Sequence, residues 1–242
     1  MDFREVVERR RMVRTYASRP VDAAMVDRII AAGLRAPSAG FTQGWAFLVF
    51  EGAEQTARFW ALTARGSEPP PAGGRIDRMR RAPVVIVPMS HKQAYLTRYA
   101  QDDKAAQGLR DEAAWPVPYW DIDTGFATMA MLLAATDAGL GAGLLGIFRD
   151  EQALLAEMGV PEGYRPIVAM TLGWPAEHDP PSPSIARGRR AGAETVHYGR
   201  WNGERSTVPG AWAGRVGRGP LESPPLESPP LESPPLESPP LS

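Results

Sequence analysis

The stretch TGFATMAMLLAATDAGLGAGLLGIF, residues 124–148, holds a glycine motif together with the elements around it, and their order decides the type of fold. Helical spacing of its larger side chains predicts a helix over residues 124–137 that stops at Gly139. The side chains with this spacing are Phe126, Met129, Leu132, Leu133 and Thr136. The apolar run GAGLLGIF that follows is typical of a buried strand, so the order along the chain is helix, then strand.

The six residues GAGLLG, 141–146, match the GxGxxG pattern of dinucleotide-binding Rossmann folds. That pattern requires a strand before it and a helix that opens within it. Because the order here is reversed, the sequence predicts that this is not a Rossmann motif. We expect instead that Gly139 caps the helix and that Gly141 and Gly143 allow a close approach of the backbone to a flat ligand.

Helices and strands alternate on both sides of this stretch. Short apolar runs predict strands at 46–50 (AFLVF), 83–87 (PVVIV), 165–173 (RPIVAMTLG) and, at the end of the domain, 194–201 (ETVHYGRW). Helices are predicted at 2–11, 21–35 and 150–158, the last capped by Asp150. The residues on the apolar face of the second helix are Met25, Val26, Ile29, Ile30 and Gly33. The segments 63–81 and 90–120 are too polar and irregular for the sheet, so we expect them to carry binding function. The pattern predicts one α+β domain of about 200 residues.

Composition excludes several classes of function. The 242 residues include 27 Lys and Arg against 28 Asp and Glu, so no overall field attracts the protein to nucleic acid or acidic lipid. The absence of cysteine excludes disulfides, thiol nucleophiles and thiolate metal sites. Three histidines at 91, 178 and 197 are too far apart in sequence for a metal motif. With no apolar leader or membrane-spanning run, we expect a cytoplasmic protein with no metal, nucleic-acid or membrane partner.

The last forty residues differ in composition from the rest. After Trp201 the chain is rich in Gly, Arg and Pro, and from Leu221 the pentapeptide LESPP repeats four times. Such a segment has too little apolar surface to form a core. We therefore predict a folded domain at 1–201 and a disordered linker and tail at 202–242. A docking role for the tail stays open, although its prolines are spaced PxxxP rather than PxxP.

Two arginine clusters lie at opposite ends of the predicted domain. RRMVRTY, 10–16, contains Arg10, Arg11 and Arg14, and RGRR spans 187–190. Taken alone, the first cluster is explained more simply as the solvated end of a helix, where cations complement the helix dipole. Alternatively, arginine forks match phosphate oxygens, and Arg10 and Arg189 could hold one phosphate if the fold brings them together. The segment APSAGFTQGWAF, 36–47, is by composition an ordinary loop between a helix and a strand.

Taken in order, these segments resemble the FMN-dependent nitroreductase family over about residues 4–201. The family's RRSxRxY/F motif followed by PV is matched at 10–16 and 20–21, and its APSxxNxQPW motif at 36–45. GLG at 139–141, PEGYRP at 161–166 and the late basic pair follow in register. Met12, Phe41 and Gly44 depart from the family's Ser, Asn and Pro. The resemblance implies an α+β nitroreductase-like fold, with a central mixed or antiparallel sheet flanked by helices, in an obligate homodimer.

The resemblance also implies a site with FMN at the dimer interface, where the loop containing Ser38 arrives from the other subunit. Arg10, Arg11 and Arg189 would hold the phosphate with help from Arg187. Arg14 would lie at the N1 and O2 edge of the flavin, and Gly146 would offer its backbone N–H to N5. The full set of implied cofactor-binding residues is Arg10, Arg11, Met12, Arg14, Pro37, Ser38, Ala39, Phe41, Gln43, Leu144, Leu145, Gly146, Arg187 and Arg189.

The implied reaction is a ping-pong transfer of electrons. NADPH or NADH donates hydride, a small aromatic acceptor such as a nitroaromatic or quinone receives the electrons, and no side chain acts as acid or base. The aromatic segment 115–120 is expected to expose rings that stack on flat substrates. Met12 removes a hydroxyl from the phosphate or ribityl site, and Phe41 is expected to contact the flavin's dimethylbenzene edge, the substrate pocket or the dimer core.

Two other functions stay open. Phe41 also resembles the pattern of the flavin destructase that cleaves reduced FMN to form the lower ligand of cobalamin. That enzyme has an aspartate in place of Met12 and a serine near Gly146, and both are missing here. The third possibility is a non-catalytic flavin-binding sensor with the LESPP tail as its interaction arm. The sequence does not decide the physiological acceptor or the choice between NADH and NADPH.

Overall fold

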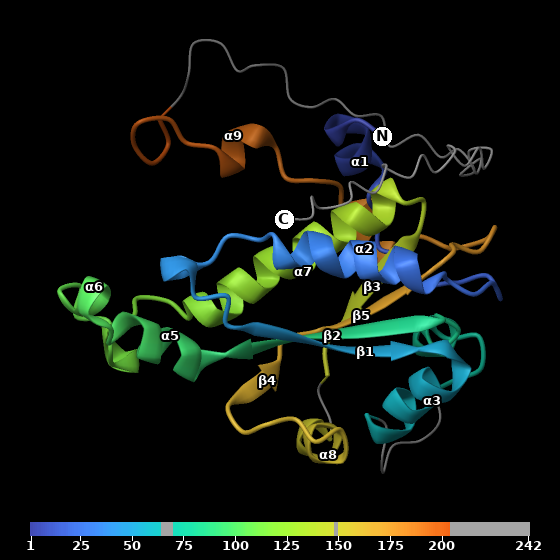
Figure 1. Cartoon of the computed structure of the whole chain (residues 1–242). Helices are drawn as coiled ribbons and strands as arrows, with labels where there is room; N and C mark the ends of the chain where they lie inside the picture. Colours follow the sequence, from blue (N-terminus) through green and yellow to red (C-terminus); the bar gives the residue numbers. More distant parts are fainter. Residues whose placement is uncertain (64–69, 148–149, 204–242) are drawn as a thin grey trace, which may run out of the picture.

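The computed structural model describes residues 1–63, 70–147 and 150–203 and has an antiparallel sheet between two layers of helices (Figure 1). The strand order is β1-β2-β5-β3, and the short β4 also pairs with β2. All four pairings are antiparallel, which confirms the predicted α+β class and the exclusion of a Rossmann fold. The strands are β1 (Trp45–Glu51), β2 (Val84–His91), β3 (Gly141–Leu145), β4 (Tyr164–Pro166) and β5 (Ala169–Gly173).

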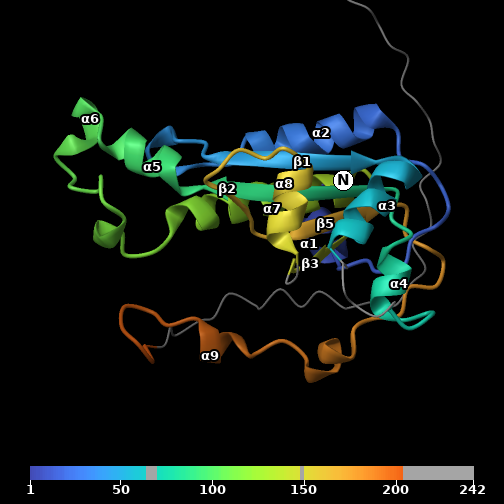
Figure 2. The same cartoon turned by 90° about the horizontal axis from the view of Figure 1, so that it is seen from below.

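Helices cover both faces of this sheet. On one face lie α2 (Ala23–Leu34) and α7 (Tyr119–Asp137), and on the other α3 (Gly52–Leu62) and α8 (Glu151–Glu157) (Figures 1 and 2). The remaining helices are α1 (Phe3–Arg9), α4 (Arg75–Met79), α5 (Lys92–Tyr99), α6 (Asp102–Ala105) and α9 (Gly192–Thr195), with single 3₁₀ turns η1 (Ala39–Phe41), η2 (Glu112–Ala114) and η3 (Pro183–Arg187).

The central strand β2 explains why PVVIV is apolar without alternation. Successive side chains of a strand point to opposite faces. Val84 and Ile86 belong to the core cluster under α2 and α7, whereas Val85 and Val87 belong to the cluster under α3 and α8. Because both faces are covered, Val84 to Val87 are all buried, as the sequence predicted.

The helix α2 shows how local sequence sets an element. The Asp22 side chain accepts a hydrogen bond from the backbone N–H of Ala24 at 2.8 Å and caps the helix. The predicted apolar face is buried against α7 at Val26 and Ile29. Gly33 allows the two helices to approach, since a Cβ there would lie 2.8 Å from Met131 Cγ.

The apolar pattern of α7 predicts the helix correctly, and the structure adds which side faces the core. The buried positions include Ala127 and Met131. Phe126 and Met129 are instead 50% and 42% exposed. The helix therefore carries an apolar strip that no other element of the described chain covers fully. The expected C-cap is confirmed, because Gly139 follows α7 with φ of 76°.

The predicted strand at 165–173 is divided into β4 and β5. Val84 pairs with Leu172 but Met89 pairs with Pro166, so the register against β2 shifts by one residue between the two strands. Pro88 explains the interruption, because it lies in β2 between these pairs and has no N–H for a continuous ladder.

Two further expectations are corrected. The terminal strand predicted at 194–201 is wrong: its first residues belong to α9, and the segment runs clear of the sheet, so it has no strand edge to pair with (Figure 2). Asp150 precedes α8 as expected, but with φ of 54° and no hydrogen bond from its side chain to the helix. Of the predicted tail at 202–242, residues 204–242 lie outside the described part.

The segment after α1 crosses β3 on top of its two glycines. Met12 forms a parallel bridge with Ala142, and the Val13 N–H donates to the Ala142 carbonyl at 2.8 Å. A Cβ on Gly141 would lie 2.6 Å from Val13 Cγ2, and one on Gly143 would overlap the Val13 carbonyl oxygen. The predicted close approach is therefore present, but its partner is Val13 and not a flat ligand.

Tyr16 fixes the far end of this segment to the sheet. Its hydroxyl lies 2.7 Å from the Thr171 hydroxyl and 3.0 Å from the Val13 carbonyl oxygen, in a fully buried setting. Burial raises the pKa of the Tyr16 phenol well above its usual value of about 10, and the Thr171 hydrogen bond opposes this only in part.

The Tyr16 phenol is expected to make the fold sensitive to alkali. Above about pH 10 the unfolded chain releases this proton while the folded chain keeps it, so the free energy of unfolding falls by about 1.4 kcal/mol per pH unit from this residue. Urea unfolding between about pH 9 and about pH 11 measures the slope. In Tyr16→Phe the slope is expected to be shallower by this amount, and an identical slope would refute the assignment.

Candidate functional site

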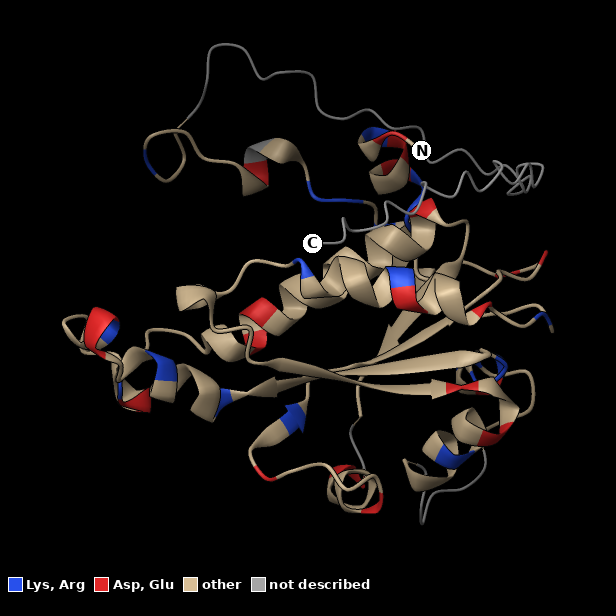
Figure 3. Cartoon of the chain, in the orientation of Figure 1, with Lys and Arg blue, Asp and Glu red and all other residues tan. Residues whose placement is uncertain are grey.

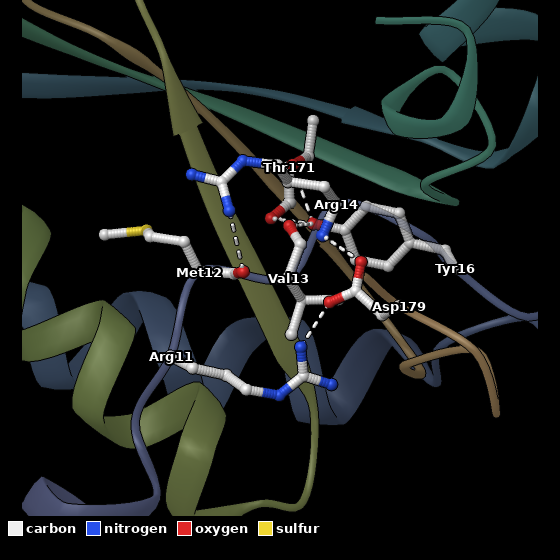
Figure 4. A network of polar contacts seen from close by, with 7 residues as sticks. All are labelled: Arg11, Met12, Val13, Arg14, Tyr16, Thr171 and Asp179. Atoms are coloured by element: carbon white, nitrogen blue, oxygen red, sulfur yellow. Dashed lines mark hydrogen bonds and ion pairs between the residues drawn. The ribbon is translucent and has the colours of Figure 1, made fainter. Parts of the chain in front are cut away.

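Residues 10–16, the arginine segment, lie against β3, and one of the three arginine side chains forms an ion pair within the chain. The Arg11 guanidinium forms an ion pair with the Asp179 carboxylate, whose side chain is only 1% exposed (Figure 4). The other oxygen of Asp179 accepts the backbone N–H of Arg14 at 3.1 Å. Asp179 thus joins the segment that follows β5 to the one that follows α1. Because its charge is neutralised, Arg11 is a weaker candidate for a phosphate ligand than the resemblance implies.

The other predicted arginines have no carboxylate partner among the described residues. Arg14 directs its guanidinium across β3 and donates only to the Met12 carbonyl, at 3.3 Å (Figure 4). Arg10 follows α1 as its C-cap residue. Arg187 and Arg189 are exposed on the arm that leads from η3 to α9, where the basic stretch is blue in Figure 3. Unpaired guanidinium groups are available to bind an anion.

The end of β3 lies next to this segment. Leu144 and Met12 both pack against the core cluster under α2 and α7. Leu145 ends the strand opposite Ala169, and Gly146 follows it half-buried. The structure therefore brings Met12, Arg14 and the predicted 144–146 segment together. It does not join the two arginine clusters, since no hydrogen bond or ion pair among the described residues links Arg10 with the arm.

The second part of the predicted site, the loop 38–43, has an unusual backbone. Gly40, Phe41 and Gln43 all have positive φ, at 61°, 54° and 51°. This conformation is costly for residues that carry a Cβ and marks stored strain. The Ser38 hydroxyl accepts the Gln43 N–H at 2.9 Å and closes the loop. Phe41 is 78% exposed, so the strained backbone directs a large apolar ring outward.

The loop and the arginine segment occupy opposite ends of one chain. The loop is tied to Asp123 in the first turns of α7, while α7 ends near Asp137, and β3 with its arginine segment follows. From Asp123 to Asp137 the helix rises about 20 Å. Figures 1 and 2 agree on this separation, with η1 beside α5 and α1 toward the other end. A single chain therefore does not place both parts of the predicted site around one small ligand.

The expectation that the aromatic segment 115–120 exposes its rings is wrong. Trp115 and Trp120 are buried in a cluster with Tyr95 and Tyr99 from α5. The Trp115 and Tyr99 rings meet edge to face at 4.8 Å between centroids, and the Trp115 indole N–H donates to the Leu109 carbonyl at 2.7 Å. These rings are the core of the 92–120 insertion, so they are not free to stack on a substrate.

Sequence reasoning missed three residues that hold this site in shape. Asp123 accepts the Ala39 N–H, Asp179 pairs with Arg11, and Arg98 donates to the Gly40 carbonyl at 3.0 Å. Asp123 gave one usable signal, because a carboxylate within an otherwise apolar helix needs a buried partner. Asp179 and Arg98 gave none, since their partners are remote in sequence.

The described residues contain no group of three or more acidic or histidine side chains that could hold a metal ion. None of the helices within the described ranges is long and apolar enough to cross a membrane.

Comparison with known proteins gives consistent matches. The sequence model described as "Nitroreductase family" matches residues 7–174. A protein of Methanothermobacter thermautotrophicus, provisionally named an NADH dehydrogenase/NAD(P)H nitroreductase, is 27% identical over 182 residues, or 74% of this chain and 80% of the relative. The 5,6-dimethylbenzimidazole synthase of Rhodospirillum rubrum is 26% identical over 182 residues, 71% of this chain and 81% of that protein. A solved structure named as an FMN-dependent nitroreductase of Clostridium difficile shares the fold at a TM-score of 0.55 and 19% identity, covering 81% of this chain and 98% of its own.

Proposed function

Because the chain belongs to the nitroreductase family, we propose that it is an FMN-dependent oxidoreductase that carries electrons from NADPH or NADH to a small aromatic acceptor such as a nitroaromatic or quinone. The observation that carries the proposal is that the guanidinium groups of Arg10, Arg14, Arg187 and Arg189 have no carboxylate partner among the described residues. Fixed cations without carboxylate partners suit an anionic phosphate and a ring that gains negative charge on reduction. FMN, when bound, supplies the two-electron chemistry.

The chain's own residues would bind and orient that cofactor. Arg10 and Arg189, with Arg187, would hold the phosphate, and Arg14 would stabilise the negative charge that the flavin gains on reduction. The Gly146 backbone N–H would be directed at the reacting edge. Met12 supplies a thioether where the family has a serine, so its contribution is packing against the core cluster under α2 and α7. No side chain need act as an acid or base.

A homodimer would bring together the two parts of the site that one chain keeps apart. The loop containing Ser38, Ala39 and Phe41 would reach the arginine segment of a second copy. The exposed strip of Phe126 and Met129 on α7, with Leu34 of α2 also 52% exposed, supports a second copy on this face of the molecule.

A second candidate is flavin cleavage of the type performed by 5,6-dimethylbenzimidazole synthase. The relative from Rhodospirillum rubrum and the presence of Phe41 favour it. Met12 and Gly146 stand against it, because neither offers the carboxylate or hydroxyl that this pattern requires. We therefore rank electron transfer to an acceptor first.

Spectroscopy of the purified protein distinguishes these functions. We expect a yellow dimer whose flavin absorbance bleaches anaerobically with NADPH or NADH and returns when a nitroaromatic or quinone is added. Bleaching without turnover of any acceptor would favour a sensor, and loss of the flavin spectrum under oxygen would favour cleavage. A colourless monomer that cannot be reconstituted with FMN would refute the proposal.

A further inference from the structure

Asp123 is a buried carboxylate that the proposed electron transfer does not use. Asp123 is 2% exposed and lies on the buried side of α7. The same oxygen accepts the Ala39 N–H and the Tyr95 hydroxyl, each at 2.8 Å. Among the described residues no cation pairs with it. Burying a carboxylate with only neutral donors costs free energy, so its hydrogen bonds must hold something that the fold requires.

What Asp123 and its neighbours hold is the strained loop 38–43. Tyr95, Arg98 and Tyr99 lie on one face of α5, at the i, i+3 and i+4 positions, and all three contact the loop or its flank. Arg98 donates to the Gly40 carbonyl, and the Tyr99 ring fills the space where a Cβ of Gly40 would be. The Tyr95 ring packs in the same way against Gly44, where an added Cβ would lie 2.5 Å from the ring.

We propose that Asp123 and Tyr95 are positioning residues for flavin binding, holding the loop 38–43 in the conformation that presents Phe41 and Gln43 to the cofactor. This inference rests on the proposed FMN-dependent function. Three observations support it. The backbone of the loop is strained, the Ala39 N–H attaches the loop to Asp123 of α7, and the Phe41 ring is exposed to solvent. The 92–120 insertion is then a brace for the loop. Burial raises the pKa of Tyr95, with the Asp123 hydrogen bond adding to it, so the phenol remains a donor at any ordinary pH.

Removal of the carboxylate tests the proposal. In Asp123→Ala the dissociation constant for FMN, measured by quenching of flavin fluorescence, is expected to rise about tenfold or more. Hydrogen exchange at the Ala39 amide is expected to become faster in the flavin-free protein, because its acceptor is gone. Asp123→Asn is expected to restore both values nearly to wild type, since its amide oxygen can accept the same two hydrogen bonds.

The matched control is Asp121→Ala, on the same helix. Asp121 accepts the Ser90 hydroxyl at 2.6 Å and pairs with Arg165 at 3.8 Å, and no hydrogen bond or ion pair among the described residues joins it to the loop. FMN affinity is therefore expected to stay within about twofold of wild type. Tyr95→Phe keeps the ring in its cluster and serves if Asp123→Ala fails to fold; it is expected to weaken FMN binding about threefold or more. Equal FMN affinity in wild type, Asp123→Ala and Tyr95→Phe would overturn the inference, as would an equal loss in Asp121→Ala. If wild type binds no FMN, the proposed function itself fails, and unchanged Ala39 exchange in Asp123→Ala would separately refute the hold on the loop.

Discussion

Replacing Arg10 and Arg189 together by alanine is expected to weaken FMN binding by about 10²-fold to 10⁴-fold. Each guanidinium is unpaired among the described residues and would form a charge-assisted hydrogen bond with the phosphate. Such bonds contribute about 1.5 to 3 kcal/mol each, and every 1.4 kcal/mol changes a dissociation constant about tenfold. Titration of the flavin-free protein with FMN at low salt measures the loss.

The control for this prediction removes the same number of positive charges from paired sites. Arg58 pairs with Glu157 at 3.0 Å, and Arg190 with Glu194 at 3.3 Å beside Arg189 on the arm. Exposed pairs of this kind contribute little to stability, so the double variant Arg58→Ala/Arg190→Ala should fold and bind FMN as wild type does. Equal affinity in the two double variants would show that Arg10 and Arg189 act only through the overall charge, or not at all.

The single variants test whether both arginines bind the phosphate. Within one chain Arg10 ends α1 and Arg189 lies on the arm, with no described interaction between the clusters. If both bind the phosphate, each single variant should lose a substantial part of the affinity that the double variant loses. A full loss in one single variant and none in the other would show that only one of the two arginines binds FMN.

Much of the fold could be predicted because its signals are local. The run at β2 is apolar at every position because helices cover both faces of the sheet, and the spacing in α2 identified Val26 and Ile29 as its buried face. The order of helix and strand around 139–146 was enough to reject the Rossmann interpretation of GAGLLG. Each of these inferences needs only a short window of sequence.

The errors arise where distant segments decide the outcome. Trp115 and Trp120 looked exposed because their segment is polar, but α5 supplies the rings that bury them. The Arg11 and Asp179 side chains are 168 residues apart in sequence, so no local pattern could indicate that this cation is already paired. The segment 194–201 carries strand-like residues, yet its conformation depends on whether a sheet edge is available. Such contacts follow from the tertiary structure alone.

Substituting alanine for Gly143 is expected to lower the free energy of unfolding by about 3 kcal/mol or more, near the upper range for an overpacked core. A Cβ there would overlap the Val13 carbonyl oxygen, with Met79 Cε at 3.2 Å closing the space beside it. The obstacle is backbone, which cannot rotate away as a flexible side chain can. Relief requires the segment to lift from β3, which breaks the Val13 to Ala142 hydrogen bond. Urea denaturation of the flavin-free protein measures the change.

The physical consequence of Gly143→Ala extends to the cofactor, because the segment that must lift also carries Arg14. Its guanidinium lies across β3 beside Met12, so a displaced backbone would move this cation away from the place proposed for the flavin (Figure 4). Loss of stability and loss of FMN affinity are therefore expected together. Gly192→Ala is the control: a Cβ there meets nothing within 4 Å, and stability should change by less than about 0.5 kcal/mol. If Gly143→Ala is as stable as wild type, the arginine segment does not pack against β3. That result would contradict the position proposed for Arg14 in the flavin site.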